Sequence, residues 1–174
     1  MVGESSAAQR PSAAAGATPE ESAGTARRPS DEEVFARYPR IRLDQVNIEH
    51  YRAMLEHKLT AGWCGHCATW HTPLRPICPS CWAPDVSVRP VAGVGTIHLL
   101  TRLNQGPPVV DYSPPWPLAA IELAEQTGLR IVATLVDTPD SLQRIGQPVE
   151  LTWIDRDGSP WPAFRAVADK ENAR

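Results

Sequence analysis

The sequence has 174 residues, of which 42% are hydrophobic and 21% charged, and its formal net charge is −3. This hydrophobic content is sufficient for a folded core, but the negative charge argues against a nucleic-acid-binding protein, which needs a basic surface. No apolar run approaches the roughly 20 residues of a membrane-spanning helix, and no apolar stretch typical of a secretory signal follows the N-terminus. We therefore expect a cytoplasmic protein with neither a membrane nor a nucleic acid as partner.

The first thirty residues differ in composition from the rest of the chain. Of residues 1–30, 21 are Ala, Ser, Pro, Gly or Thr, and none is aromatic. Such a segment cannot bury enough apolar surface to offset the entropy that is lost on ordering it. We expect a disordered leader over 1–30 and a short C-terminal tail over 169–174.

Two short helices are predicted over residues 31–58. In "SDEEVF", Ser30 at the N-cap and Glu33 three residues later form a capping-box pattern, and this helix must end by Pro39. In "NIEHYRAMLEHKL", Asn47 is placed to cap a second helix. The apolar residues of that helix recur at helical spacing and form a stripe that packs on its own domain or docks a partner. The stripe consists of Ile48, Tyr51, Leu55 and Leu59.

All four cysteines stand in "CGHCATWHTPLRPICPSC", as two C-x-x-C pairs separated by ten residues. Two such pairs on tight turns place four sulfurs at the corners of a tetrahedron, each about 2.3 Å from a bound zinc ion. Gly65, Pro79 and Ser80 are residue types that tight turns favour. The sequence therefore predicts a zinc ribbon over 59–91 with a structural metal. Its expected ligands are Cys64, Cys67, Cys78 and Cys81.

Other interpretations of the four cysteines compete with the zinc ribbon. Iron in a rubredoxin-like site uses the same four sulfurs, and the sequence does not distinguish it from zinc. Disulfides are unfavourable in a reducing cytosol, and a thioredoxin-like pair opens a helix, which Pro79 opposes. A catalytic zinc keeps an open coordination position, whereas four thiolates fill all of them. Because four thiols are present, we expect His66 and His71 at the surface or behind the ligands.

Residues 92–168 have β character and are expected to form a barrel. Two strands flank the cysteines at 59–64 and 86–91, and five more follow, with a helical turn between the third and the fourth. The Gly of "AEQTG" and the Asp-Gly of "RDGS" indicate hairpin turns. The fold class is thus mainly β with N-terminal helices: a rubredoxin-like zinc ribbon followed by a five-stranded OB-fold barrel. The barrel strands are expected at 95–103, 116–123, 129–136, 149–155 and 162–167.

The segment "NQGPPVVDYSPPWP", residues 104–117, does not fit a strand because it contains five prolines. A long proline-rich loop is stiff and presents its aromatic residues, here Tyr112 and Trp116. Loops of this length in compact domains are often functional. Two interpretations stay open: Tyr112 and Trp116 contact a ligand or partner, or the loop covers one end of the barrel.

The order of these segments resembles a known family, the zinc-ribbon/OB-fold family of acyl-CoA-associated proteins, long filed as a domain of unknown function. The similarity covers residues 45–168 and includes the helical stretch "HYRAMLEHKL" and the cysteine ribbon. In the barrel it includes "GVGTIHLLTRL", the "LAAIEL…GLRIVATLV" hairpin and "RIGQPVELTW". The ribbon motif alone is common to many zinc proteins, whereas the ordered series is more specific.

The resemblance implies a function by association. Members of the family accompany thiolase-like proteins, among them thiolases and aldolases of sterol side-chain breakdown and acyl-transferring complexes, and others are joined to hotdog-fold hydratases. It implies that this chain is a non-catalytic accessory subunit that binds and stabilises a thiolase-like partner and helps to form its acyl-CoA entrance. The family has no agreed catalytic residues, so only the four metal-binding cysteines carry over.

The residues themselves favour binding over catalysis. The sequence has no H-E-x-x-H, P-loop or Rossmann glycine motif, and an enzyme acting alone on a CoA thioester would lack a spare thiol nucleophile. The alternatives are a nucleic-acid-binding zinc-ribbon/OB protein, which would lack its basic groove, and a partner of a hotdog-fold enoyl-CoA hydratase. Aromatic residues, which often carry interface energy, are candidates for contact. They are Trp82, Tyr112, Trp116, Trp153 and Trp161.

Overall fold

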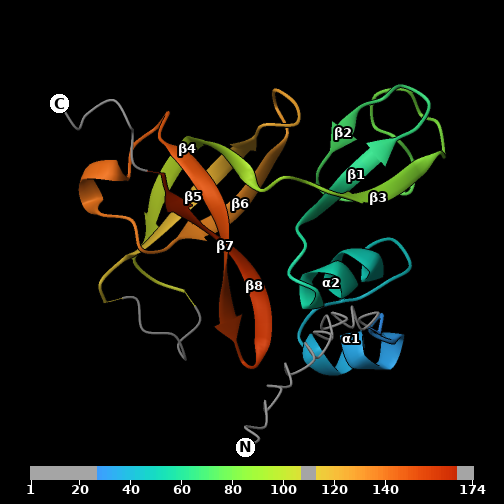
Figure 1. Ribbon diagram of the computed structural model, residues 1–174, viewed down its shortest axis with the longest axis horizontal. Helices are drawn as coiled ribbons and strands as arrows, with labels where there is room; N and C mark the ends of the chain where they lie inside the picture. Colours follow the sequence, from blue (N-terminus) through green and yellow to red (C-terminus); the bar gives the residue numbers. More distant parts are fainter. Residues whose placement is uncertain (1–26, 107–112, 168–174) are drawn as a thin grey trace, which may run out of the picture.

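Residues 27–106 and 113–167 are described by a computed structural model of the protein (Figure 1). In chain order they form a pair of helices, a three-stranded sheet that carries the cysteines, and a closed barrel of five strands. Figure 1 shows the helix pair and the cysteine-bearing sheet on one side of the barrel. The predicted architecture, N-terminal helices followed by a ribbon and a five-stranded barrel, is confirmed.

Helix α1 (Asp31–Arg37) begins where the capping-box pattern predicts. The Ser30 hydroxyl accepts a hydrogen bond from the Glu33 N–H at 3.3 Å, and the Glu33 carboxylate accepts one from the Ser30 N–H at 2.7 Å. These bonds satisfy backbone donors that the start of a helix otherwise leaves free. The chain leaves the helix at Tyr38, directly before Pro39, as the sequence predicts.

Helix α2 (Ile48–Leu55) follows Asn47, but the side chain of Asn47 does not cap it. The Asn47 amide oxygen accepts a hydrogen bond from the Asp44 N–H at 2.9 Å, and its NH₂ group donates to the Arg42 C=O at 3.0 Å. The prediction of a capping side chain was therefore wrong, because Asn47 orders the turn that precedes the helix instead of the helix itself.

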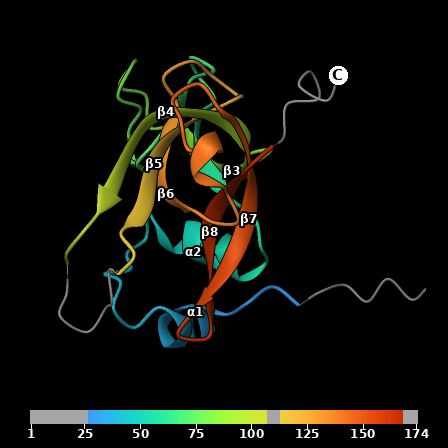
Figure 2. The same ribbon diagram turned by 90° about the vertical axis from the view of Figure 1, so that its left-hand side faces the viewer.

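The apolar stripe of α2 packs on the protein's own α1 and on the β7–β8 hairpin. One member of the predicted stripe does not belong to it: the helix ends at Leu55, His57 takes a left-handed conformation (φ 56°), and Leu59 enters the barrel core instead. Figures 1 and 2 both show the β7–β8 hairpin reaching beyond the barrel alongside the two helices. The cluster comprises the buried Val34, Tyr38 and Met54, surrounded by Ile41, Leu43, Ile48, Tyr51, Leu55, Trp153 and Trp161.

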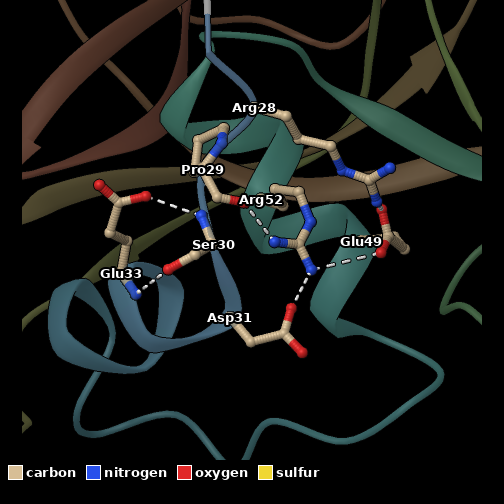
Figure 3. A network of polar contacts seen from close by, with 7 residues as sticks. All are labelled: Arg28, Pro29, Ser30, Asp31, Glu33, Glu49 and Arg52. Atoms are coloured by element: carbon tan, nitrogen blue, oxygen red, sulfur yellow. Dashed lines mark hydrogen bonds and ion pairs between the residues drawn. The ribbon is translucent and has the colours of Figure 1, made fainter.

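A buried arginine joins the two helices (Figure 3). Arg52 of α2 is only 7% exposed, and its guanidinium donates to the Asp31 carboxylate and to the Pro29 C=O. Glu49 accepts a further bond from it at 3.4 Å and also pairs with the exposed Arg28. A buried charge without partners is costly, so these contacts hold α2 against the start of α1. They raise the pKa of Arg52, chiefly through the hydrogen bond with Asp31.

Three strands form the cysteine-bearing sheet: β1 (Thr60–Cys64), β2 (Trp70–His71) and β3 (Val86–Pro90), in the order β2-β1-β3. The sequence predicts β1 and β3 but not β2, because two residues carry no periodic pattern. His71 lies against Gly62 of β1, where a Cβ atom would come within 2.4 Å of the imidazole ring. Only glycine therefore fits at position 62.

Five strands close the barrel in the order β4-β5-β6-β8-β7. A short 3₁₀ turn, η1 (Asp140–Leu142), stands between the third and fourth strands, as predicted. Both predicted hairpin turns are present, with Gly128 at φ 84° after β5 and Asp157 and Gly158 at φ 54° and 78° after β7. The strands are β4 (Val94–Leu103), β5 (Trp116–Leu123), β6 (Arg130–Leu135), β7 (Pro148–Arg156) and β8 (Ser159–Ala166).

The barrel core extends into the ribbon. Leu59 and Ala61, at the start of β1, pack with the buried residues of the barrel, among them Ile97, Ile121 and Phe164. This shared core binds the two parts together, since burial of apolar surface is the main favourable term in folding.

Hydrogen bonds also fasten the ribbon to the β5–β6 hairpin. The Gln126 side chain accepts from the Trp70 N–H at 2.9 Å and donates to the Trp70 C=O at 3.0 Å, much as a neighbouring strand would. The Thr72 hydroxyl donates to the Arg130 C=O at 2.6 Å. The metal-binding part of the chain is therefore held against the barrel by polar contacts as well as by apolar packing.

Two expectations concern the remaining parts of the chain. Tyr112, one of the two predicted contact residues, lies outside the described residues. In residues 27–106 and 113–167, no helix is long and apolar enough to cross a membrane.

Replacing Arg52 by Met should lower the free energy of unfolding by about 2–3 kcal/mol, because charge-assisted hydrogen bonds to α1 and its cap are lost. Urea denaturation measures this change. Arg28→Met is the matched control, because it removes only an exposed ion pair with Glu49 and should cost less than about 1 kcal/mol. Equal losses for the two variants would contradict a structural role for the buried arginine.

Candidate metal centre and exposed aromatic residues

The four cysteines meet at one end of the ribbon. Their Sγ atoms all lie within 4.8 Å of one another, and Cys64–Cys81 and Cys67–Cys78 are each 3.6 Å apart. In a tetrahedron with Zn–S bonds of about 2.3 Å, the sulfurs are about 3.8 Å apart. The sulfur positions therefore fit one tetrahedral metal ion, and all four cysteines are free of disulfides.

The surroundings of the sulfurs favour a thiolate at Cys78 but not at Cys81. Burial would raise the pKa of the Cys78 thiol, but the backbone N–H groups of Cys81 and Ser80 outweigh it and lower that pKa to about 6. At Cys81 the backbone of Ala83 lowers the pKa, yet burial and the other three cysteines raise it to about 12. Four adjacent negative charges need a cation, because like charges disfavour further ionisation.

Both cysteine turns end in a residue with left-handed backbone geometry. Ala68 follows Cys67 at φ 53°, and Trp82 follows Cys81 at φ 63°. Each donates its N–H back across the turn, Ala68 to the Cys64 C=O at 2.9 Å and Trp82 to the Cys78 C=O at 3.0 Å. The left-handed region favours glycine, and a bulky residue in it is strained. The ribbon therefore places a tryptophan where its backbone would favour a glycine.

The nearby histidines are not ligands. His66 is exposed between the first two cysteines, and His71 is buried against Gly62 with its Nδ1 atom 3.3 Å from the Pro73 C=O. Among the described residues, the only group of three or more His, Cys, Asp or Glu side chains close enough to share a metal is the cysteine cluster. Four sulfurs complete a tetrahedral shell, so this metal is structural and leaves no position for a substrate.

The second cysteine turn carries the most exposed tryptophan among the described residues. Trp82 is 78% exposed, and Ile77, directly before Cys78, is 46% exposed. Of the other aromatic candidates, Trp153 and Trp161 are half-buried against the helices and are part of that packing. Among the described tryptophans, the largest exposed fraction therefore belongs to the ribbon tip. The sequence includes Trp82 among five aromatic candidates but does not distinguish it from the others.

Trp116, the described member of the predicted contact pair, lies at the start of β5. It is 37% exposed and lines a cavity of about 630 Å³ between the end of α1 and the β7–β8 hairpin. The Arg156 guanidinium lies 5.9 Å from the ring centroids of both Trp116 and Trp161, within reach of a cation–π contact. Arg40 lies on the same cavity. The lining also includes Asp155 and Asp157, and Arg40 pairs with Asp157 at 3.7 Å. The cavity thus combines aromatic rings with side chains of both charges.

Two family profiles match adjoining parts of the chain. Residues 53–87 match "ChsH2, rubredoxin-like zinc ribbon domain", and residues 88–153 match "ChsH2, C-terminal OB-fold domain". A "DUF35 domain-containing scaffold protein" of Pyrococcus furiosus is 31% identical over 104 residues, which cover 59% of this chain and 71% of that protein. The chain belongs to the zinc-ribbon/OB-fold family of DUF35 proteins. The predicted family is thereby confirmed.

The chain also resembles part of a longer protein and chains of solved structures. The chain is 31% identical over 137 residues to a "Probable enoyl-CoA hydratase alpha subunit" of Thermomonospora curvata; the match covers 78% of this chain but only 42% of that relative. A solved structure described as "Ltp2-ChsH2(DUF35) aldolase" has a chain with 28% identity and a TM-score of 0.63, covering 72% of this chain and 98% of that one. A Sulfolobus solfataricus DUF35 protein of unknown function, 12% identical with a TM-score of 0.52 over 76% of this chain and 92% of that one, shares the fold.

Purified protein should contain one metal ion per chain, and Cys78→Ser should abolish its binding, because metal binding supplies folding free energy of about 10 kcal/mol or more to such sites. Elemental analysis measures the metal, and near-UV circular dichroism follows the packed Trp63 and Trp70 of the ribbon. His66→Ala is the control and should retain the ion. Protein that holds neither zinc nor iron, or loss of metal in the His66 variant, would refute this assignment.

Proposed function

We propose that this protein is a non-catalytic accessory subunit that binds and stabilises a thiolase-like partner, namely a thiolase, aldolase or acyltransferase acting on acyl-CoA thioesters. The observation that carries the proposal is the similarity to the "Ltp2-ChsH2(DUF35) aldolase" structure, in which 98% of one chain is matched. That aldolase is described by two component names, and the component that this chain resembles is the DUF35 one. Degradation of steroid or lipid side chains is the process that we propose for the pair.

The metal in this proposal is zinc, bound by Cys64, Cys67, Cys78 and Cys81. The role of the ion is to supply the stability that a ribbon of about thirty residues lacks, because so small a segment cannot bury enough apolar surface. The chemistry on the acyl-CoA belongs to the partner, since four thiolates leave the metal no open position.

Trp82 and Ile77 are the proposed contacts with the partner at the ribbon tip. Trp82 adopts a left-handed backbone that costs about 1–2 kcal/mol for an L-residue, yet its ring is 78% exposed and buries little surface in return. Tryptophan is enriched among residues that dominate binding energy. A strained and exposed tryptophan is therefore better explained by a partner surface than by the stability of the isolated chain.

Trp116 is the proposed contact near the acyl-CoA entrance, together with Tyr112, which remains a prediction from the sequence. The cavity beside Trp116 places the Arg156 guanidinium within reach of an anionic ligand, and guanidinium groups suit phosphates in particular. Arg40 in the same cavity pairs with Asp157. This contact would lie at the junction of the helices and the barrel.

A second candidate is a partner of the hydratase class. The similarity to a "Probable enoyl-CoA hydratase alpha subunit" favours it. This chain matches less than half of that relative, so the part that it does not match would correspond to the partner. The accessory role and the substrate class would be the same, and only the catalytic partner would differ.

The isolated protein should turn over no acyl-CoA, whereas the complex with a thiolase-like protein encoded beside it should be active, because the partner supplies the catalytic groups. Co-expression, affinity purification of this chain and an assay of CoA release measure both outcomes. Pairing with a neighbouring enoyl-CoA hydratase instead would select the second candidate. Turnover by the isolated chain would refute the accessory role.

Trp82→Gly should slightly stabilise the isolated protein, by up to about 1 kcal/mol, because glycine relieves the left-handed strain. It should also weaken assembly with the partner by about tenfold or more, because an exposed anchor is lost. Ala68→Gly relieves the same geometry at the first turn and should leave assembly unchanged. Thermal melts and a binding titration separate the effects. A clear loss of stability in the Trp82 variant would mean that the ring serves the fold.

A further inference from the structure

Within residues 27–106 and 113–167, one strand of the barrel has no hydrogen-bonded neighbour along half of one edge. β6 pairs with β5 from Arg130 to Thr134, but it pairs with β8 only at its end, through Thr134–Ala163 and Leu135–Phe164. The first half of β6 therefore has a hydrogen-bonded strand on one side only.

The register identifies the backbone groups that face this open edge. Leu123 donates to the Leu129 C=O at 2.8 Å, so this is a hydrogen-bonded pair of the β5–β6 ladder. Such pairs alternate along antiparallel strands, which directs the N–H and C=O groups of Arg130 and Val132 away from β5. The Arg130 C=O accepts the Thr72 hydroxyl. The N–H and C=O of Val132 thus point to the open edge.

Prolines explain why β8 does not continue along β6. The Val167 N–H donates to the Pro148 C=O at 3.0 Å, and by the same alternation the backbone groups at positions 160 and 162 of β8 face β6. Pro162 has no N–H to offer the Val132 C=O. The Pro160 C=O is occupied by the Tyr38 hydroxyl at 3.0 Å. In a continuous ladder the Val132 C=O would therefore have no donor, and the Val132 N–H would have to share the Pro160 C=O with Tyr38.

A groove lies in front of this edge, with α2 as its opposite wall. Two adjoining cavities, of about 500 and 250 Å³, share His50 and Tyr51 of α2 with Ile131 and Val132 of β6. Val132 is 64% exposed. The groove is therefore open to solvent and lined on one side by a strand, which suits an extended polypeptide.

The charge of the groove differs from that of the chain. The chain carries a net charge of −3, yet neither cavity has an Asp or Glu in its lining, and each has an arginine: Arg130 in the larger and Arg156 in the smaller. Arg130 pairs with Glu122 outside the groove. Among the described lining residues, carboxylates of a bound segment would meet no acidic side chain and would find an arginine near each end of the groove, although Arg130 is already paired with Glu122.

We propose that the β6 edge at Val132 accepts an extended segment of the partner subunit as an added strand, with apolar residues alternating with acidic ones. The segment bonds the backbone N–H and C=O of Val132, lies between β6 and α2, and directs carboxylates toward Arg130 and Arg156. The identity of the partner rests on the proposed function, whereas the chemistry of the groove does not. Strand addition of this kind derives affinity from main-chain hydrogen bonds and specificity from side chains.

A capped synthetic peptide of alternating Glu and Val residues is the probe, and it is titrated into the full-length protein. Binding should weaken by about tenfold or more when the peptide is N-methylated at its amides, because main-chain hydrogen bonds are lost. Replacing its Glu residues by Lys should weaken binding similarly. Equal binding by all three peptides would overturn the proposal, as would no binding of the first.

Val132→Pro tests the same site from the protein side. Proline removes the N–H that faces the groove, and no hydrogen bond with β5 is lost at this position, so the barrel should tolerate it as an edge strand does. Val132→Thr keeps the N–H and is the matched control. We expect the proline variant to lose peptide binding and the threonine variant to retain it. Peptide binding by the proline variant at unchanged affinity would contradict the proposal.

Amide hydrogen exchange keeps the test decisive if the proline variant fails to fold. In the full-length protein the Val132 N–H should exchange rapidly, and it should become protected when the Glu-Val peptide or the partner is bound. Protection in the absence of both would mean that the edge is occupied by a segment of this chain or by a second copy, and the proposal would fail. Because the peptide titration needs no partner, its outcome is independent of whether a thiolase-like subunit co-purifies.

Discussion

The ribbon depends on the attraction between four clustered thiolates and one cation. Cys64, Cys67, Cys78 and Cys81 lie within 4.8 Å of one another, a spacing that four negative charges cannot hold by themselves. The metal also closes both cysteine turns, and those turns fix the positions of β1, β2 and β3. Leu59, directly before β1, and Ala61 within β1 pack in the barrel core. Apolar packing therefore joins the strand that leads to the cysteines to the barrel.

Outside the metal site, the packing of the helices affects which aromatic side chains and which strand edges stay exposed. The helices pack against Trp153 and Trp161 of the β7–β8 hairpin and partly bury both side chains. Trp82 at the ribbon tip is instead exposed and has a strained, left-handed backbone conformation. The same helical packing reaches the barrel, because the Tyr38 hydroxyl donates to the Pro160 C=O on the β8 edge where Pro162 lacks an N–H for β6. A scaffold role needs such surfaces more than it needs reactive groups, since binding energy comes from a few well-placed anchors.

The sequence predicts those features that local patterns encode. The capping box at Ser30, the two C-x-x-C pairs and the Asp-Gly turn are confirmed because each depends on residues close together in the chain. Asn47 misleads because its amide has competing partners in the preceding turn, a choice that local spacing does not determine. The strand β2 is too short for any periodicity to identify it.

The features on which the proposed partner binding rests depend on distant residues. The exposure of Trp82 follows from the fold of the second cysteine turn, and the open edge at Val132 follows from Pro162 and Tyr38, which are far apart in the sequence. Patterns in a single sequence do not predict which distant residues come into contact, because the tertiary structure determines those contacts.

Native mass spectrometry of the co-expressed proteins tests the central claim most directly, because it reports assembly and metal content together. We predict a hetero-oligomer of this chain with a thiolase-like subunit, in which each copy of this chain carries one zinc ion. A chain that retains its zinc but is found only by itself, while the neighbouring enzyme is fully active alone, would contradict the account.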